Sequence, residues 1–467
     1  MAGDPISKFA AILQYYHLLE PAQLAEVTGP LARFFPDFKS LAGELIRRGW
    51  LTPYQVNQIF QGRASELLLE SYVLLERIGE GGMGQVFKAR NWKLNRLVAL
   101  KLIRKERLNN SEIIRRFQRE VRASAQLNHP NVVHAYDCGE CGDRHFYVME
   151  YVEGINLAQL VRRDGPLSVD LACECIRQAA LGLQHAFERG LVHRDIKPHN
   201  LLLTKSSDGQ NVIKILDMGL ARLDIGGDSI DSGTMTHEGA VLGTLDYIAP
   251  EQARNAHLAD TRADLYSLGC TLHFLLTGQA PFAGGTPTEK LLKHQFQPPP
   301  PIQKLRPEVP ASLAAVLQRL LAKQPEQRYQ TPAETAAALA SVLNKTAVST
   351  AQNGGGWAGA GGPPAGRGGP PAPAHPTAVP VEPVVTAAIP IEASSSADEP
   401  FPSAVGHGQA MADTIGGWSS IVDAPSSSSS SSFRRRSASL HRQRVIGLSI
   451  LGGLALVALI VLLFLLL

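Results

Sequence analysis

The spacing of apolar residues near the start of the chain is helical. Within residues 1–66, apolar side chains recur three and four positions apart, for example at Leu41 and Leu45. This spacing predicts short amphipathic helices, which Gly49 and Pro53 separate. The segment carries no motif of known chemistry, so we expect a small helical module with a docking or regulatory role.

The pattern changes over residues 71–345. The early segments YVLLERIGE, QVFKAR, LVALKLI and HFYVMEYV read as strands, whereas the later segments VDLACECIRQAALGLQHAFERG and ADLYSLGCTLHFLLTG read as helices. Strands that precede helices in this way predict an α+β protein with two lobes.

Residues 346–444 are dominated by glycine, proline, alanine and serine. Such a composition cannot bury enough apolar surface to fold, so this segment is expected to be a disordered linker. It ends in RRRSASLHRQR, whose five arginines form a basic juxtamembrane stretch.

The last segment, Val445–Leu467, contains no charged residue. Its 23 residues are enough to cross a hydrocarbon core of about 30 Å as a helix. A buried core helix is the alternative, but the preceding linker offers no core. Because the run stops at the last residue and arginines precede it, we expect a C-terminal anchor without an ectodomain, with everything before it cytoplasmic.

Composition excludes several classes of protein. The 467 residues exceed one ordinary domain, and a net charge of +3 gives no nucleic-acid signature. The first twenty residues lack the features of a signal peptide. The cysteines are few and odd in number, so no disulfide framework is implied and a reducing cytoplasm fits. Cys138 and Cys141 form a lone C-x-x-C, which we interpret as free thiols.

The stretch IGEGGMGQVFKAR contains Gly79, Gly81 and Gly84 in the spacing G-x-G-x-x-G. Glycines let a hairpin backbone close over phosphates and present its N–H groups to them. A dinucleotide site would require a helix after the glycines. A strand follows here, which disfavours a nicotinamide-dependent enzyme.

Two charged residues further along are candidates for the same site. VALK places Lys101 on a strand, where its ammonium could bind phosphate oxygens. Glu120 is its candidate partner, on a helix whose apolar face includes Phe117 and Val121. Taken singly, either charged residue would more often be structural.

The densest cluster of functional groups is VHRDIKPHN, residues 192–200. Asp195 could accept a proton, Lys197 could stabilise a phosphoryl group, and Asn200 offers an amide oxygen to a hard cation. KILDMGLAR then adds Asp217 at the end of an apolar strand. Together these residues describe a site for Mg²⁺ and a triphosphate rather than a solvated loop.

In this order the motifs resemble those of the protein kinases, over residues 71 to about 335. The resemblance implies a small, mainly β N-lobe and a large, mainly α C-lobe. It identifies Ala249, Pro250 and Glu251 as the end of the activation segment. It also implies that Asp264 braces the catalytic loop and that Arg328 pairs with Glu251.

Lys197 and Thr244 resemble the serine/threonine rather than the tyrosine class, and GEGGMG and APEQA are most similar to bacterial members. The resemblance makes Met149 the gatekeeper and Glu150–Val152 the hinge for adenine. The nucleotide contacts it implies are Ile78, Gly79, Glu80, Gly81, Gly82, Met83, Gly84, Gln85, Val86, Lys101, Glu150 and Val152.

The same resemblance assigns roles around ATP and Mg²⁺, with Mn²⁺ as an alternative metal. Lys101 would bind the α- and β-phosphates while Glu120 holds it, and Asp217 and Asn200 would bind the metal. Asp195 would deprotonate the acceptor hydroxyl, and Lys197 would steady the transferring group.

Two positions depart from the family pattern. Met218 stands where phenylalanine is usual, and an apolar side chain of similar reach should preserve function. Glu238 occupies the second position of a Thr-x-Thr pair and carries part of a phosphate's charge. We therefore expect autophosphorylation at Thr236, with Thr234 and Ser232 as lesser candidates.

These features predict a membrane-anchored serine/threonine protein kinase that acts on proteins at the cytoplasmic face of a membrane. The bacterial resemblance points to the inner membrane, and a homodimer through the kinase lobes is compatible with it. A receptor-type sensor is disfavoured because no ectodomain is expected. The alternative is an inactive membrane-tethered scaffold, although Lys101, Asp195, Asn200 and Asp217 are all present.

Overall fold

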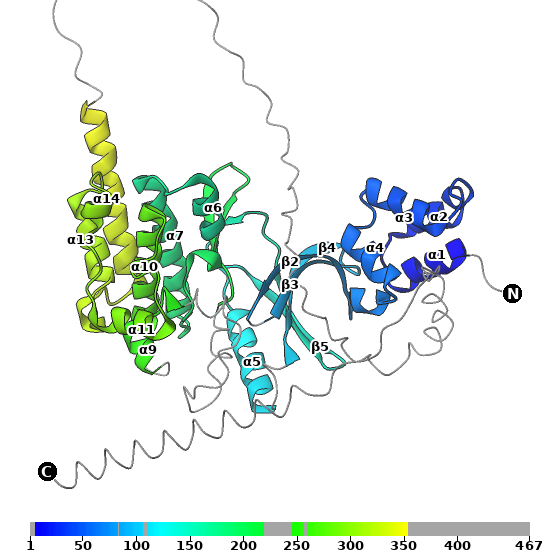
Figure 1. Cartoon of the computed structure of the whole chain (residues 1–467), viewed down its shortest axis with the longest axis horizontal. Helices are drawn as coiled ribbons and strands as arrows, with labels where there is room; N and C mark the ends of the chain where they lie inside the picture. The colour runs from blue at the N-terminus through cyan, green and yellow to red at the C-terminus, as the bar shows by residue number, and fades with distance from the viewer. Residues whose placement is uncertain (1–4, 83, 106–110, 219–244, 256–258, 354–467) are drawn as a thin grey trace, which may run out of the picture. The chain divides into compact units, whose positions relative to one another are not determined.

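The computed structural model describes residues 5–82, 84–105, 111–218, 245–255 and 259–353 (Figure 1). Within these ranges, no helix is both long enough and apolar enough to cross a membrane. The predicted anchor, Val445–Leu467, and nearly all of the predicted linker lie outside the described residues.

The N-terminal module contains the short helices that its periodicity predicts. Its apolar positions, among them Leu41 and Leu45, are buried between these helices. Pro53 is the first residue of α4 rather than a break within a helix, a position where its missing N–H costs nothing. The elements are α1 (Pro5–Tyr15), α2 (Pro21–Thr28), η1 (Leu31–Arg33), α3 (Phe38–Arg47), α4 (Pro53–Phe60) and η2 (Ala64–Leu67).

An antiparallel sheet of six strands follows, in the order β1-β2-β3-β4-β6-β5. Figure 1 shows it curled, with α5 (Ser111–Ser124) beside it. The four segments predicted as strands correspond to β2, β3, β4 and β6. The strands are β1 (Leu68–Leu69), β2 (Tyr72–Gly81), β3 (Gly84–Asn91), β4 (Arg96–Ile103), β5 (Ala135–Cys141) and β6 (Arg144–Glu150).

Both faces of this sheet are buried, which explains its apolar strands. On one face, Ala99 and Tyr147 pack with Phe117 and Val121 of α5. On the other, the cluster consists of Leu69, Tyr72, Leu74, Phe87, Ala89, Val98, Leu100, Phe146 and Val148. Alternate residues of β4 therefore enter different cores, as the period of two in a strand requires.

A small sheet, β7-β8-β9, leads from the strand lobe to the helices. Its strands are β7 (Ile155–Asn156), β8 (Leu201–Lys205) and β9 (Asn211–Ile215). A single 3₁₀ turn, η4 (Pro198–Asn200), precedes β8. Because β8 and β9 form a hairpin, the residue before β8 and the residue after β9 lie close together.

The second lobe is helical, and α7, α10, α13 and α14 lie together in it (Figure 1). A close approach fixes Gly269 in α10, since a Cβ there would lie 2.8 Å from the Cβ of Leu320. The helices are α6 (Leu157–Asp164), α7 (Val169–Phe187), α9 (Pro250–Arg254), α10 (Thr261–Thr277), α11 (Pro287–Phe296), α12 (Ile302–Leu305), α13 (Ala311–Leu320), η7 (Pro325–Gln327) and α14 (Pro332–Asn353). The prediction of strands first and helices afterwards, in two lobes, is confirmed.

Candidate active site

A buried carboxylate holds the backbone of the loop that precedes η4. The amide of His193 donates to Asp264 Oδ2 at 2.8 Å, and the amide of Arg194 donates to Oδ1 at 2.7 Å. Burial raises the pKa of Asp264, and the nearby His193 ring and these two amides oppose that rise. Asp264 lies on α10, most of whose residues are buried, so this helix sets the position of the loop.

The ring of His193 links this loop to the end of β9. Its Nε2 lies 2.8 Å from the carbonyl oxygen of Leu216, and the amide of Asp195 donates to its Nδ1 at 3.2 Å. These two contacts place the ring proton on Nε2. The imidazole therefore ties the residue before Asp217 to the backbone of Asp195.

Two residues of the site have left-handed backbone, which is uncommon for residues with a Cβ. The φ angle is 70° at Arg194 and 55° at Asp217. Such conformations cost about 1–3 kcal/mol and persist only where the surroundings fix them. At Arg194 the surroundings are the Asp264 contact and the Gln252 side chain, which donates to its carbonyl at 2.7 Å.

Lys197 and Asn200 converge on the carboxylate of Asp195. Lys197 Nζ lies 2.8 Å from Asp195 Oδ2, and Asn200 Nδ2 donates to the same oxygen at 3.0 Å and to the Asp195 carbonyl at 2.8 Å. Asn200 is buried, whereas the Asp195 and Lys197 side chains are each about one-fifth exposed. The carboxylate is thus held in place by two donors and still reaches solvent.

Lys101 and Asp217 join the two lobes at this point. Lys101, on β4, is only 5% exposed, and its Nζ lies 2.8 Å from Asp217 Oδ2. Burial acts to raise the pKa of Asp217, but the charge and hydrogen bond of Lys101 outweigh burial and hold that pKa below its ordinary value. The predicted partner Glu120 lies on α5, one turn from the buried residue Phe117.

The second oxygen of Asp217 has the features of a cation ligand. Asp217 Oδ1 is buried and has no hydrogen-bond partner among the described residues. The amide of Leu216 donates to the Asn200 carbonyl at 2.9 Å, so the two predicted metal ligands lie on adjoining backbone. A carboxylate oxygen with this free capacity fits Mg²⁺, which prefers hard oxygen ligands.

The glycine-rich stretch forms the β2–β3 hairpin. Ile78, Gly79, Glu80 and Gly81 end β2, and Gly84, Gln85 and Val86 begin β3; Gly82 lies between, and Met83 is outside the described residues. A Cβ at Gly84 would lie 1.9 Å from the carbonyl oxygen of Leu102 on β4, so only glycine fits there. Val86 is half-buried against the cluster around Ala99.

The residues identified as gatekeeper and hinge lie at the end of β6. Met149 is buried opposite Ala99, and Val152 packs against the same cluster. The Glu150 carboxylate contacts Lys214 Nζ at 3.0 and 2.9 Å through its two oxygens. Lys214 lies on β9, so the hinge is linked to the strand that delivers Asp217.

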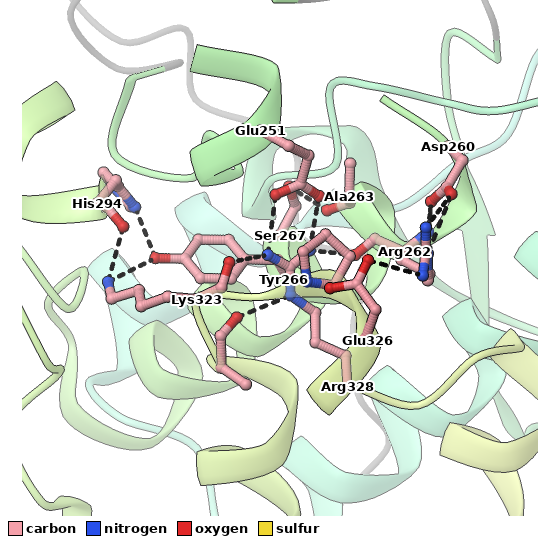
Figure 2. A network of polar contacts seen from close by, with 12 residues as sticks. Glu251, Asp260, Arg262, Ala263, Tyr266, Ser267, His294, Lys323, Glu326 and Arg328 are labelled. Atoms are coloured by element: carbon pink, nitrogen blue, oxygen red, sulfur yellow. Dashed lines mark hydrogen bonds and ion pairs between the residues drawn. The ribbon is translucent and has the colours of Figure 1, made fainter. Parts of the chain in front are cut away.

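A second polar network lies within the helical lobe (Figure 2). Arg328 is fully buried, and it donates to both Glu251 oxygens at 2.7 and 2.9 Å. Its other N–H groups reach three carbonyls, those of Arg262, Ala322 and Lys323. All five donors of the guanidinium are therefore used.

Two side chains with lowered pKa values, His294 and Lys323, flank this network in Figure 2. His294 is fully buried and contacts the Tyr266 hydroxyl at 2.9 Å; burial, aided by the Lys323 charge, lowers its pKa to about 3. Lys323 Nζ donates to the His294 carbonyl at 2.8 Å, and burial lowers its pKa to about 8.

Several predicted residues lie outside the described ranges. They are Gly219, Ser232, Thr234, Thr236, Glu238 and Thr244. Met218 is described, and it is buried in the core of the helical lobe; its carbonyl accepts from Ser124 of α5 at 2.7 Å.

Sequence reasoning missed three supporting side chains: Gln252, Lys214 and Lys290. Lys290 of α11 is buried and lies 2.5 Å from Asp246, just before α9. No local signal marks such residues, because a lysine or glutamine in a strand or helix is usually exposed. All five cysteines are free thiols.

Comparisons with known proteins agree with this geometry. A model of the protein kinase domain matches residues 72–339. The serine/threonine-protein kinase PknB of Mycolicibacterium smegmatis is 40% identical over 280 residues, which are 59% of this chain and 43% of that protein. The serine/threonine-protein kinase PrkC of Bacillus subtilis is 40% identical over 260 residues, 56% of this chain and 38% of that protein. The chain thus matches less than half the length of either relative.

Proposed function

Since the chain belongs to the protein kinase family, we propose that it transfers the γ-phosphate of Mg–ATP to serine and threonine hydroxyls of proteins. The names of PknB and PrkC, both serine/threonine kinases, support this acceptor class. The observation that carries the proposal is a chain of contacts: Asn200 bonds to Asp195, the backbone of Asn200 bonds to the residue before Asp217, and Asp217 contacts Lys101.

The roles of the side chains follow from their contacts. Asp195 is held by Lys197 and Asn200 and remains partly exposed, so it can accept the proton of an acceptor hydroxyl. Lys197 lies beside that carboxylate, where it can stabilise the charge of the transferring phosphoryl group. Lys101 is a second basic residue, and a buried one, suited to the inner phosphates.

Asp217 Oδ1 and the Asn200 side chain would hold the metal ion. When bound, Mg²⁺ (or Mn²⁺ in its place) neutralises phosphate charge. Asp217 would offer Oδ1 to the ion, since its other oxygen contacts Lys101. Its lowered pKa keeps it ionised and ready to bind at neutral pH.

We extend the proposal to regulation and place in the cell. Thr236, with Thr234 and Ser232 as lesser sites, would be autophosphorylated, and Val445–Leu467 would anchor the chain in a bacterial inner membrane with the kinase lobes cytoplasmic. Contact between lobes of two anchored copies would favour transfer between them.

The full chain incubated with Mg–ATP, beside Asp195→Asn, tests the activity by intact mass and phosphopeptide mapping. We expect phosphate on the wild type and about 10²–10⁴-fold slower transfer in Asp195→Asn, because the variant lacks the proton acceptor. Equal phosphate on both would contradict the role of Asp195, and none on either would favour an inactive scaffold.

Cell fractionation tests the anchor. We expect the full chain in the membrane fraction and a chain that ends before Val445 in the soluble fraction. If both are found in the same fraction, the apolar segment is not the anchor.

A further inference from the structure

The N-terminal module is continuous with the strand that carries the glycine-rich turn. Residues Ala64–Leu67 form η2, which runs directly into β1, and β1 pairs with β2 through Leu69 and Tyr72. No linker separates module and sheet. A displacement of the module would therefore also displace β2.

The strand β2 contains an irregularity three residues after its pairing with β1 begins at Tyr72. Leu74 pairs with Ala89 and Glu76 pairs with Lys88, so Leu75 is an extra residue, a β-bulge. A second register shift follows between Arg77 and Gly79. Bulges bend a strand and increase its twist, and these two lie immediately before the glycine-rich turn.

The first turn of α4 contacts this bulge. The Thr52 hydroxyl donates to the carbonyl of Leu75, and Gln55 Nε2 donates to the carbonyl of Leu74 at 2.9 Å. In a regular strand, successive carbonyls point to opposite edges. Two consecutive carbonyls can both meet α4 only because the strand is bulged here.

Thr52 and Gln55 also hold each other. The backbone amide of Gln55 donates to Thr52 Oγ1 at 3.2 Å, and the backbone amide of Thr52 donates to Gln55 Oε1 at 3.0 Å. This is the reciprocal arrangement of a capping box. Gln55 is fully buried. The start of α4 and the bulge of β2 therefore form one hydrogen-bonded unit.

Other contacts fix the module to β3, the second strand of the hairpin, and to Trp92, the residue after it. The His17 ring stacks on Trp92 with centroids 4.0 Å apart and planes 7° apart. Arg90 pairs with Glu20 at 3.1 Å. Tyr54 packs on the buried ring of Phe87 at 5.8 Å. The module thus contacts both strands of the hairpin, β2 and β3.

We propose that Thr52 and Gln55 are positioning residues for the glycine-rich hairpin: they fix the bulge at Leu75 and thereby the register that places Gly79–Val86 over the nucleotide. Without them the bulge can move along β2, and a shift of one residue sends each side chain to the opposite face. This inference rests on the proposed phosphotransfer function, because only a bound nucleotide gives the hairpin a group to position.

The full chain carrying Thr52→Val tests the inference, with affinity for Mg–ATP measured by calorimetry and hydrogen exchange measured over Gly79–Val86. We expect affinity to fall about fivefold and exchange to rise by a similar factor, as loss of about one hydrogen bond predicts. The maximal rate at saturating nucleotide should change less than about twofold. The double variant Thr52→Val with Gln55→Met should show about a tenfold loss of affinity.

Two further variants separate positioning from stability. Thr52→Ser keeps the hydroxyl and should match the wild type. Asp37→Ala removes the N-cap of α3, whose carboxylate bonds to Lys39 and Ser40 of its own helix, so it should lower thermal stability without changing nucleotide affinity.

Unchanged affinity and exchange in Thr52→Val would overturn the inference, and so would an equal loss of affinity in Asp37→Ala. A wild type that neither binds Mg–ATP nor transfers phosphate would instead overturn the proposed function. Nucleotide binding without transfer in the wild type leaves the affinity comparison intact, so the two failures are distinguishable.

Discussion

Two carboxylates on either side of the same loop are used in opposite ways. Asp264 accepts one backbone amide on each oxygen and is sealed in the helical lobe. Asp217 has one oxygen on Lys101 and leaves Oδ1 buried without a partner among the described residues. The pKa of Asp264 is raised while that of Asp217 is lowered.

The difference shows how this lobe divides its polar groups. The groups that hold the geometry, Asp264 and the Glu251–Arg328 pair, are saturated by internal hydrogen bonds. The groups assigned to chemistry, Asp195 and Asp217, keep capacity for a ligand. Buried polar groups left incomplete are costly, so the fold tolerates this at the site, where we expect a ligand to complete it.

The strongest way to break this comparison is Asp217→Asn. We expect phosphotransfer to fall by about 10³-fold or more, roughly 4 kcal/mol in the barrier, because the metal loses its charged ligand. Asparagine keeps the shape of the side chain and an oxygen that can accept from Lys101, so urea unfolding should show a smaller loss of stability than removal of the Arg328 guanidinium. A large loss of stability would place Asp217 with the structural carboxylates.

Removing Arg328 from its pair with Glu251 should have the reverse outcome, a large loss of stability. Arg328→Met leaves Glu251 buried and unpaired, which should cost about 3 kcal/mol or more of unfolding free energy. Urea denaturation measures it. Arg262→Met removes a partly exposed pair with Asp260 and should cost less than about 1 kcal/mol; equal losses would contradict the distinction.

His294 offers a pH-dependent version of the same test. Its pKa is lowered to about 3, against about 6.5 in an unfolded chain, so the folded state resists protonation. Stability is therefore full above about pH 6.5 and is lost as the pH falls toward 3. Between pH 7.5 and 5, the wild type should lose about 2 kcal/mol more than His294→Gln, measured by urea unfolding at both values. Identical pH profiles would show that the imidazole is protonated without cost.

The smallest effect is expected at the hinge. Lys214→Met removes the partner of Glu150, so the strand that carries Asp217 is no longer tied to the hinge. We expect KM for ATP to rise about threefold while kcat stays within about twofold, as suits a partly exposed pair. Lys205→Met, on the exposed end of β8, is the matched control and should leave both constants unchanged.

Much of the candidate site could be read from local sequence. Asp195, Lys197 and Asn200 lie within six residues, so their closeness along the chain limits their separation in space. The glycines at 79, 81 and 84 mark a hairpin by their spacing alone. The contact of Lys101 with Asp217 was not predicted, because it joins residues 116 positions apart.

The supports of the site were harder to predict for the same reason. The sequence TPYQ at residues 52–55 carries the signature of a capping box, so the start of α4 is readable. That its side chains also reach the Leu74 and Leu75 carbonyls depends on a bulge in another element.

The sequence by itself therefore determined the two-lobed fold class, the order of the motifs and the residue types at the site, because these follow from short-range periodicity and spacing. The family resemblance already implied that Asp264 braces the loop and that Arg328 pairs with Glu251, but only the tertiary structure decided that Asp217 Oδ1 has no hydrogen-bond partner among the described residues. Asp217 and Asp264 are both aspartates beside apolar residues in the sequence, and they differ in the distant groups that reach them: the Lys101 side chain for Asp217 and two backbone amides for Asp264. Hydrogen bonding and desolvation act over a few ångströms in space, whatever the separation along the chain.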